Sequence, residues 1–409
     1  MLNILHITDF HFKNDRKEII DQEQIVENLV NDLKVYQIDA IIFSGDLVFS
    51  GEEEKDFQDA QKLLLNRLGQ ELNISKSNIV ICSGNHDMNR KERIDGVIKQ
   101  LDKNVTNNDE LESYLKSSDF DHSIKPMNNF FSFQKTFYDS IDSLKHIEKL
   151  FSVFEIEINS EKIGIVSINN SWRAVGLDDE NKLLFPTSKL KESLSYLTKD
   201  CVYKALVMHH PFSDLRKFNS YDIENVIYNS FDILFSGHRH KKETEVNYTT
   251  KDGIIKIVSP ATLSKEYGSQ IGYTILGINS EDLLYEVTNR YYDSKADTFY
   301  GPEIKKIDIP TSVEKKEANK FRQKIQKKFD VELLRSNQLL ISKVEESDES
   351  SFFHVTTEPV IKTKSIAEIS SQDDVPPDFK WNNFKDDDID YLVLGKGKCG
   401  KTVLLKKIQ

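Results

Sequence analysis

Short apolar runs that end in polar, metal-binding types of side chain recur along the first 240 residues, and this pattern constrains the fold more than any other feature. The polar groups that follow these runs are Asp9-Phe10-His11, Gly45-Asp46, Gly84-Asn85-His86-Asp87, His209-His210-Pro211 and Gly237-His238-Arg239-His240. Short apolar runs of this kind are typical of buried strands. Open α/β sheets place their ligand sites beyond the carboxyl ends of the strands. We therefore expect one site to be built from several strand ends.

The segments between these groups predict alternating strands and helices. The predicted strands are Leu2–Thr8, Ala40–Ser44, Ile79–Ser83, Ile163–Asn169, Ala205–Met208 and Ile233–Ser236. Gln24–Tyr36 and Phe57–Leu72 carry apolar residues at intervals of three to four, which is typical of amphipathic helices. Alternation of this kind predicts an α/β fold with helices on the sheet faces.

Three further segments complete the expected organisation. Residues 92–150 are rich in Asn, Asp, Ser and Lys and predict a helical insertion or cap. Thr274–Ile278 and Leu284–Val287 flank an Asn279-Ser280 turn and predict a hairpin that closes a sheet edge. Thr311–Arg335 predicts a charged amphipathic connector helix. The predicted domains are residues 1–305, a connector and linker over 306–388, and a further domain that starts at 389.

Composition limits the classes of protein that the chain fits. The formal net charge is −12, which disfavours a broad basic face that wraps nucleic acid but leaves room for a local basic groove. The three cysteines form no CxxC pair, so neither a zinc knuckle nor a disulfide framework is indicated. There is no leader pattern and no apolar run long enough for a membrane span. We expect a cytoplasmic protein without membrane contact.

The polar groups at the strand ends form a donor set suited to transition metals. Carboxylates, one amide oxygen and several imidazoles favour manganese, iron, zinc, cobalt or nickel, whereas cages of oxygen alone favour magnesium or calcium. Asp9 and His11 can face one ion, and His238 and His240 can face two neighbouring ions. A bridging Asp46 would hold two ions about 3.5 to 4 Å apart, the spacing of two-metal hydrolytic sites. Manganese is the expected metal.

The order of these motifs resembles the calcineurin-like metallophosphoesterase family over about residues 1 to 300. The resemblance implies a four-layer αββα sandwich that hydrolyses phosphate esters with two divalent ions. It implies that His86 is an outer-sphere acid or phosphate contact and that Asp87 orients its ring. In the His209-His210 pair, the family's ligand aligns best with His209. The metal ligands implied are Asp9, His11 and His240 for one ion, Asn85, His209 and His238 for the other, and Asp46 for both.

Each motif taken alone has a structural alternative. A lone Asp-x-His is commonplace, and His-His-Pro is more often a turn with a hydrogen-bonded core histidine than a ligand pair. Five such motifs in this order, each at a predicted strand end, favour the metal site instead. Some proteins of this fold bind partners without hydrolysis, but they usually lack ligands, and this sequence lacks none. Its departures are the insertion and Phe212, where a second proline is frequent.

A second motif lies near the end of the chain. Residues 395–402 read Gly-Lys-Gly-Lys-Cys-Gly-Lys-Thr after the apolar run Tyr391–Leu394, which is a Walker A pattern in its usual context. Gly395, Gly400, Lys401 and Thr402 would bind the phosphates and Mg²⁺ of ATP. Only seven residues follow Thr402, so we expect the NTPase domain to continue beyond this chain. The motif is similar to STAND or NACHT-type NTPases; the alternative is a glycine-rich turn.

These motifs lead to three hypotheses of function. The first is a nuclease effector for DNA or RNA under the control of a C-terminal STAND-type NTPase, as the resemblance to prokaryotic antiviral defence proteins of this layout implies. It would form homo-oligomers through the NTPase region. The second is a phosphodiesterase or phosphatase for cyclic or other nucleotides. The third is a metal-bound recognition module without turnover.

Overall fold

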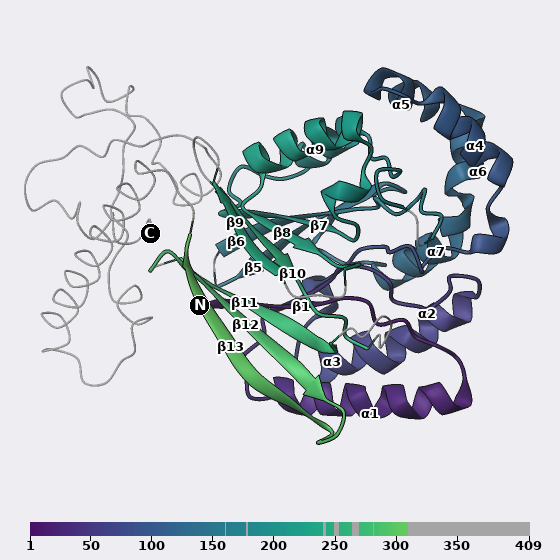
Figure 1. The fold of residues 1–409 in the computed structure, drawn as a ribbon. Helices are drawn as coiled ribbons and strands as arrows, with labels where there is room; N and C mark the ends of the chain where they lie inside the picture. The colour runs from purple at the N-terminus through teal and green to yellow at the C-terminus, as the bar shows by residue number, and fades with distance from the viewer. Residues whose placement is uncertain are drawn as a thin grey trace, which may run out of the picture. The chain divides into compact units, whose positions relative to one another are not determined.

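The computed structural model describes residues 1–159, 161–176, 179–239, 243–248, 253–263, 270–280 and 282–309 (Figure 1). The chain divides into two units after Ser312, and all described residues belong to the first. The predicted connector helix and the Walker A residues 395–402 lie outside the described residues. They therefore remain predictions.

The first sheet has six strands and contains three of the predicted strand ends. Its order is β13 (Thr298–Asp308), β12 (Leu284–Asp293), β11 (Gly272–Asn279), β1 (Leu2–Ile7), β2 (Ala40–Phe43) and β3 (Ile79–Ile81). Strands β1, β2 and β3 are parallel, so their carboxyl ends meet at one edge of the sheet. The predicted hairpin is β11 and β12, but it does not close the edge, because β13 pairs with β12 and is the outer strand.

The second sheet has seven strands. Its order is β4 (Leu144–Ile147), β5 (Phe151–Ile158), β6 (Glu161–Ile168), β7 (Tyr203–Met208), β8 (Ile233–Ser236), β10 (Gly253–Val258) and β9 (Glu243–Tyr248). Strands β6, β7, β8 and β10 are parallel to one another, whereas β5 pairs with β6 in the antiparallel direction. Nearly every described side chain of β7 and β8 is buried, which explains their continuous apolar runs.

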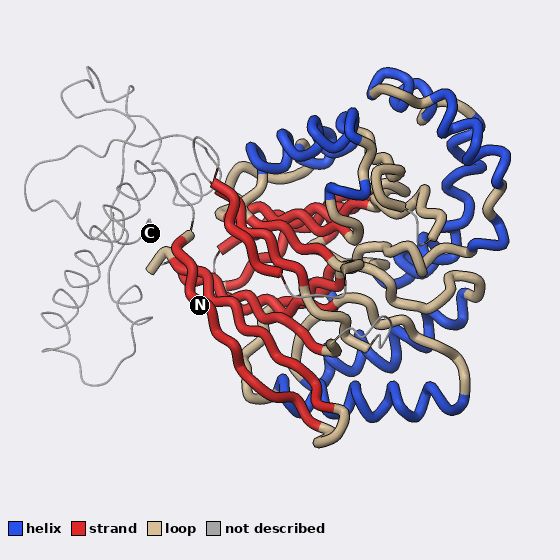
Figure 2. Tube along the Cα trace, viewed as in Figure 1, coloured by secondary structure: helices blue, strands red, loops and turns tan. Residues whose placement is uncertain are grey.

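Helices cover the outer faces of both sheets and confirm the predicted four-layer α/β/β/α sandwich (Figures 1 and 2). On the side of the first sheet lie α1 (Arg16–Leu33), α2 (Glu54–Ala60), the π-helical η1 (Gln61–Asn66) and α3 (Arg67–Glu71). On the side of the second lie α8 (Thr187–Leu194) and α9 (Lys217–Ser230). None of the described helices is long and apolar enough to cross a bilayer.

The longest described helix shows how the local sequence sets an element. Helix α1 begins where the Asp15 side chain accepts hydrogen bonds from the backbone N–H groups of Lys17 and Glu18, so an N-cap satisfies two of its first donors. Its buried face includes Ile25, Val26, Leu29 and Leu33 at helical spacing. That face packs into the core, whereas the opposite face is charged.

The predicted insertion is helical, as expected. It consists of α4 (Asp95–Asn104), α5 (Asn108–Tyr114), α6 (Ser118–Ile124) and α7 (Asn128–Phe137), with short 3-10 turns at η3 (Arg90–Glu92) and η4 (Lys125–Met127). Phe133 of α7 stacks on Phe57 of α2 with ring centroids 5.4 Å apart. This contact secures the insertion to the helical layer of the first sheet. The helical part of the insertion ends before residue 144, where strand β4 begins.

Candidate metal centre

Five strand ends from both sheets converge on one place between the sheets. Asp9 and His11 follow β1, Asp46 follows β2 and Asn85 follows β3, all in the first sheet; His209 follows β7 and His238 follows β8, in the second. Apart from His238, which is partly exposed, these side chains are buried. Six of the seven predicted metal ligands are thus brought together, and the seventh, His240, lies outside the described residues.

Asp46 is at the middle of this arrangement. Its Oδ2 lies 3.2 Å from Nε2 of His209 and 3.7 Å from Nε2 of His11. Its Oδ1 accepts a hydrogen bond of 2.7 Å from the backbone N–H of His86. One carboxylate therefore faces imidazoles that come from two different sheets, which is the position a bridging ligand needs.

His209 presents a defined nitrogen to Asp46 and Asn85. Its Nδ1 lies 2.8 Å from the carbonyl oxygen of Ser44, and a carbonyl can only accept, so Nδ1 carries the proton. Its Nε2 is therefore the nitrogen that faces the site, 3.1 Å from Oδ1 of Asn85. A backbone carbonyl that fixes the tautomer in this way is the usual second-layer support of a metal-binding histidine.

Asp9 joins the two sheets on the other side of Asp46. Its Oδ2 accepts hydrogen bonds from the Thr8 hydroxyl at 2.8 Å and from the backbone N–H of His238 at 3.2 Å. Its Oδ1 lies 3.6 Å from Nε2 of His11. The end of β8 is thereby held against the end of β1.

The backbone takes an unusual conformation at four of the predicted ligands. Asp9, His11, Asp46 and His238 have φ values of 53°, 50°, 61° and 67°. Positive φ is uncommon for residues other than glycine, and such conformations concentrate at functional sites, where the surrounding structure holds them in place. All four residues lie in the loops that follow β1, β2 and β8.

Two glycines permit the close approach of these segments. A Cβ added at Gly84 would collide with the Asp46 carboxylate. Gly45 has a φ of 109°, and a Cβ there would lie 2.5 Å from Nδ1 of His209. Glycine is therefore required in both the Gly45-Asp46 and the Gly84-Asn85 motifs because no larger residue fits.

Burial and mutual charge set the protonation of the cluster. Burial alone would raise the pKa of Asp46, but His209 and His86 hold it below its usual range. Burial would lower the pKa of His209, but Asp46 and Asp9 outweigh this and raise it to about 9. Burial, with His210 and His209, lowers the pKa of His238 to about 2. His238 is therefore neutral, the form in which an imidazole binds a cation.

His86 and Asp87 lie beside the cluster but do not act on each other as the resemblance implied. Nδ1 of His86 donates to the carbonyl oxygen of Phe49 at 2.8 Å, so Phe49 orients the ring. The Asp87 carboxylate instead accepts from the backbone N–H groups of Asp46, Val48 and Gly84 at 2.8 to 3.1 Å. Asp87 fixes the loop that carries Asp46. Burial and the nearby Asp46 raise its pKa to about 7, while the backbone donors oppose this rise.

His210 forms a pair that the sequence pattern did not reveal. It is fully buried, and its Nδ1 lies 3.0 Å from Oδ2 of Asp214. Its ring centroid is 4.0 Å from that of His238, whose Nε2 is 3.7 Å from the same Asp214 oxygen. Asn170 accepts from the backbone N–H groups of both His209 and His210 at 3.3 Å. The aspartate four residues after His210 was the available sequence signal.

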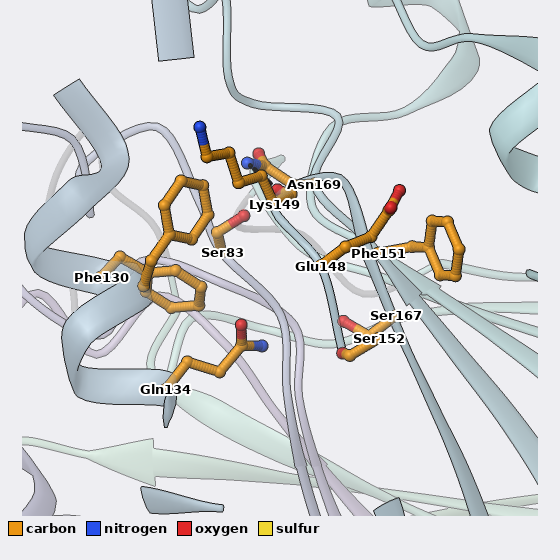
Figure 3. A pocket seen from close by; sticks show the side chains of 10 residues that line it. Ser83, Phe130, Gln134, Glu148, Lys149, Phe151, Ser152, Ser167 and Asn169 are labelled. Carbon is orange, nitrogen blue, oxygen red and sulfur yellow. Dashed lines mark hydrogen bonds between the residues drawn. The ribbon is translucent and has the colours of Figure 1, made fainter. Parts of the chain in front are cut away.

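A small pocket lies behind the Gly84-Asn85 loop and is separate from the cluster. Figure 3 shows it between Phe130 and Gln134 of α7 and Ser152 and Ser167 of the second sheet, with Ser83 on its wall. Its volume of about 200 Å³ includes space open to solvent. Sites for small-molecule ligands usually occupy about 300 to 1,000 Å³. The pocket is too small for a substrate.

The donor set fits two cations. Three groups of three side chains could each hold a cation, because the ligand atoms within each group lie within 4.8 Å of one another. The groups are His209, His210 and His238; His11, Asp46 and His86; and Asp9, Asp46 and His209. Asp46 belongs to two of the groups and joins them. Mixed oxygen and nitrogen donors of this kind suit divalent transition metals. The cluster supports a centre for two divalent metals.

Comparison with known proteins agrees with this geometry. The model of the family described as "Calcineurin-like phosphoesterase" matches residues 2–242. The uncharacterized metallophosphoesterase-like protein YydB of Bacillus subtilis (strain 168) is 22% identical over 303 residues. That alignment covers 71% of this chain and 59% of the relative, so the chain spans little more than half of the relative's length.

Two solved structures are similar to this chain at low sequence identity. A dimetal phosphatase from Danio rerio is 12% identical, covers 76% of this chain and 99% of its own, and has a TM-score of 0.41. The purple acid phosphatase PPD1 of yellow lupin (Lupinus luteus) is 12% identical, covers 74% and 53%, and has the same TM-score of 0.41. The family match extends over more than half of the chain and includes the strand ends that meet at Asp46. The chain belongs to the calcineurin-like phosphoesterase family.

Proposed function

We propose that this chain is a two-metal phosphodiesterase and that its substrate is nucleic acid. The observation that carries the proposal is the position of Asp46, whose Oδ2 faces His209 at 3.2 Å and His11 at 3.7 Å. A carboxylate placed between two groups of metal-binding side chains can act as the shared ligand of two cations. Its backbone conformation, with φ of 61°, is held by the Asp87 contacts.

The remaining ligands divide between the two cations. Asp9 and His11, together with His240, would hold one; Asn85, His209 and His238 would hold the other. Asn85 supports this division because its Oδ1 shares the space beside Asp46 with Nε2 of His209. When bound, the two metals supply an activated water and neutralise charge on the phosphoryl group.

His86 is placed to contact the substrate at the edge of the centre. Its ring centroid is 4.5 Å from that of His11, and its Nδ1 donates to the Phe49 carbonyl, which leaves Nε2 as the atom available to a phosphate or a leaving oxygen. When the ring is doubly protonated, transfer of the Nε2 proton would neutralise the leaving oxygen as its bond to phosphorus breaks and would leave the ring neutral. Such a role needs no covalent intermediate.

The choice of nucleic acid and the mode of control rest on the sequence. A Walker A motif at residues 395–402 would place the phosphodiesterase under the control of a STAND-type NTPase, with oligomerisation through that region. We expect manganese as the metal and an antiviral effector as the biological role. The nearest alternative is hydrolysis of cyclic or other nucleotides.

A substrate panel with the full-length protein tests these proposals together. Plasmid DNA, single-stranded oligonucleotides, RNA, cyclic AMP and a bis-aryl phosphate would be incubated with Mn²⁺, Zn²⁺, Ni²⁺ or no metal, with and without ATP. Cleavage of nucleic acid that depends on metal and increases with ATP is the expected result. Hydrolysis of cyclic AMP with nucleic acid untouched would favour the alternative, and normal metal content without any hydrolysis would favour a recognition module.

A further inference from the structure

We infer that the exposed ring of Phe49 is the stacking platform for a nucleobase beside the scissile phosphate. The inference rests on the proposed function and adds the class of substrate: a nucleotidyl ester whose base is unpaired. No sequence motif pointed to Phe49, and its place in the structure is the reason for the inference.

Phe49 is a large apolar side chain left open at the edge of the candidate metal centre. Its side chain is 39% exposed, whereas the residues on either side of Asp46 are buried. Its ring centroid lies 5.4 Å from that of His86 and 6.4 Å from that of His11. Single exposed apolar residues are normal on a surface, but this one borders two histidines of the site and fixes one of them through its own carbonyl.

Two cations accompany the ring. Nζ of Lys13 lies 4.2 Å from the centroid of the Phe49 ring, a cation–π contact. Arg90 lies four residues after His86 in the chain and is exposed. Within the described ranges, neither Lys13 nor Arg90 forms an ion pair with a carboxylate. Both charges are available to an anion.

An aromatic face with adjacent unpaired cations matches the chemistry of a nucleotide. Bases stack on aromatic side chains with little dependence on sequence, and the flanking phosphates meet lysine and arginine. The flexible stem of Lys13 lets its ammonium leave the ring for a phosphate oxygen as the base arrives. A duplex hides the faces of its bases, so the platform favours single-stranded or frayed substrates.

Binding of a fluorescent base tests the platform without relying on turnover. A short single-stranded oligonucleotide containing 2-aminopurine would be titrated into the full chain, and its fluorescence quenching would report stacking. We expect Phe49→Ala to weaken binding by about 5- to 150-fold, the range for loss of one base–aromatic contact, and to abolish the quenching. Phe49→Trp should retain both. Tyr221→Ala, which removes a 76% exposed ring on α9, is the matched control and should behave as wild type.

An oligonucleotide with an abasic analogue in place of 2-aminopurine separates stacking from phosphate binding. Wild type and Phe49→Ala should bind this ligand equally. Equal losses on both ligands, or no loss on either, would overturn the inference, provided that Phe49→Ala keeps the wild-type melting temperature and metal content.

The same titrations distinguish this inference from the proposed function. Phe49-dependent quenching without cleavage of any oligonucleotide would mean that the nuclease proposal fails while the platform stands. Phe49-dependent binding of a free fluorescent nucleotide, but not of the oligonucleotide, would keep the platform and assign it to small nucleotides. Binding of duplex in preference to single strands, unaffected by Phe49→Ala, would overturn it.

Discussion

The two flanks of the candidate metal centre are built in opposite ways. On the deep flank, formed by His209, His210, His238 and Asp214, the two adjacent histidines are fully buried and each has a partner: a backbone carbonyl for His209 and a carboxylate for His210. On the open flank, formed by His86, Phe49 and Lys13, one backbone carbonyl orients one ring and the rest is accessible.

The difference separates two tasks of a hydrolytic site. Cation binding requires ligands whose positions are fixed before the metal arrives, and the contacts of the deep flank supply this. Substrate binding and release require side chains that solvent and ligand can reach, and the open flank supplies these. Asp46 lies between the flanks, so the comparison predicts that substitutions will differ in kind as well as in size.

The largest effect is expected at Asp46, where both flanks meet. Asp46→Ala removes the carboxylate that faces His209 and His11, so metal binding should fail on both sides. We expect the loss of phosphodiesterase activity to exceed about 10⁴-fold, the upper end for a single acid–base group. Metal content by elemental analysis and activity on a bis-aryl phosphate would be measured together. Retention of two metals would contradict the central role of Asp46.

A substitution on the open flank should reduce turnover while metal stays bound. His86→Ala removes a ring that the Phe49 carbonyl orients and changes none of the seven proposed metal ligands, so the ligand set is preserved. We expect the rate to fall by about 10²- to 10⁴-fold, as for loss of a general acid. Elemental analysis should show wild-type metal content. Loss of metal from this variant would mean that His86 belongs with the ligands, and the division into flanks would fail.

The converse is expected on the deep flank. Asp214→Asn keeps the shape of the side chain but weakens its hold on His210 and His238. Outer supports of metal ligands typically contribute about 10- to 100-fold to metal affinity, so the dissociation constant of one metal should rise by this factor. Activity should recover at high metal concentration. Asp21→Asn, at an exposed position on α1, is the control.

The recovery of activity at high metal concentration distinguishes a role in metal binding from a purely structural role. A merely structural role of Asp214 would lower the melting temperature and the activity at every metal concentration. If excess metal fails to restore Asp214→Asn, the deep flank does not act through the metal.

Much of the fold could be predicted because buried parallel strands leave a plain signal. All six predicted strands are present, since each is an apolar run that is buried along nearly its whole length. Strand β13 was missed because most of Thr298–Asp308 is exposed at the edge, where charged residues replace the apolar pattern. Strand β4 was assigned to the insertion because it is only four residues long and half-buried.

The predicted site residues were identifiable by side-chain type, but their supports were not. Asp46 and His209 follow apolar runs and carry groups that bind metals, so the sequence marks them. The carbonyl of Phe49 orients His86 through backbone that any residue would supply, and only the folded loop brings it there. Asn170 reaches His209 from the neighbouring strand end, a contact without a fixed spacing in the sequence. Support of this kind depends on tertiary approach.

The smallest effect on activity is expected where the insertion contacts the loops that follow β6 and precede α9. Asp102 of α4 bonds through one oxygen to the buried Arg173 and, at 2.6 Å, to Arg216. Asp102→Ala leaves Arg173, which is 1% exposed, without this partner, and such a loss costs about 1 to 3 kcal/mol. The cost stays below that of a fully buried pair because the Asp102 side chain is 40% exposed.

Chemical denaturation would measure the fall in the free energy of unfolding. The activity and metal content of the folded variant should stay close to those of wild type, since no described hydrogen bond joins Asp102 to the metal-binding residues. Asp102→Asn, which keeps an acceptor for the two guanidinium groups, should lose less stability. A variant with unchanged stability but weaker metal binding would show that the insertion positions the deep flank. The contact between Asp102 and Arg173 would then affect His209 through the loop that carries Asn170, which accepts a hydrogen bond from the His209 backbone.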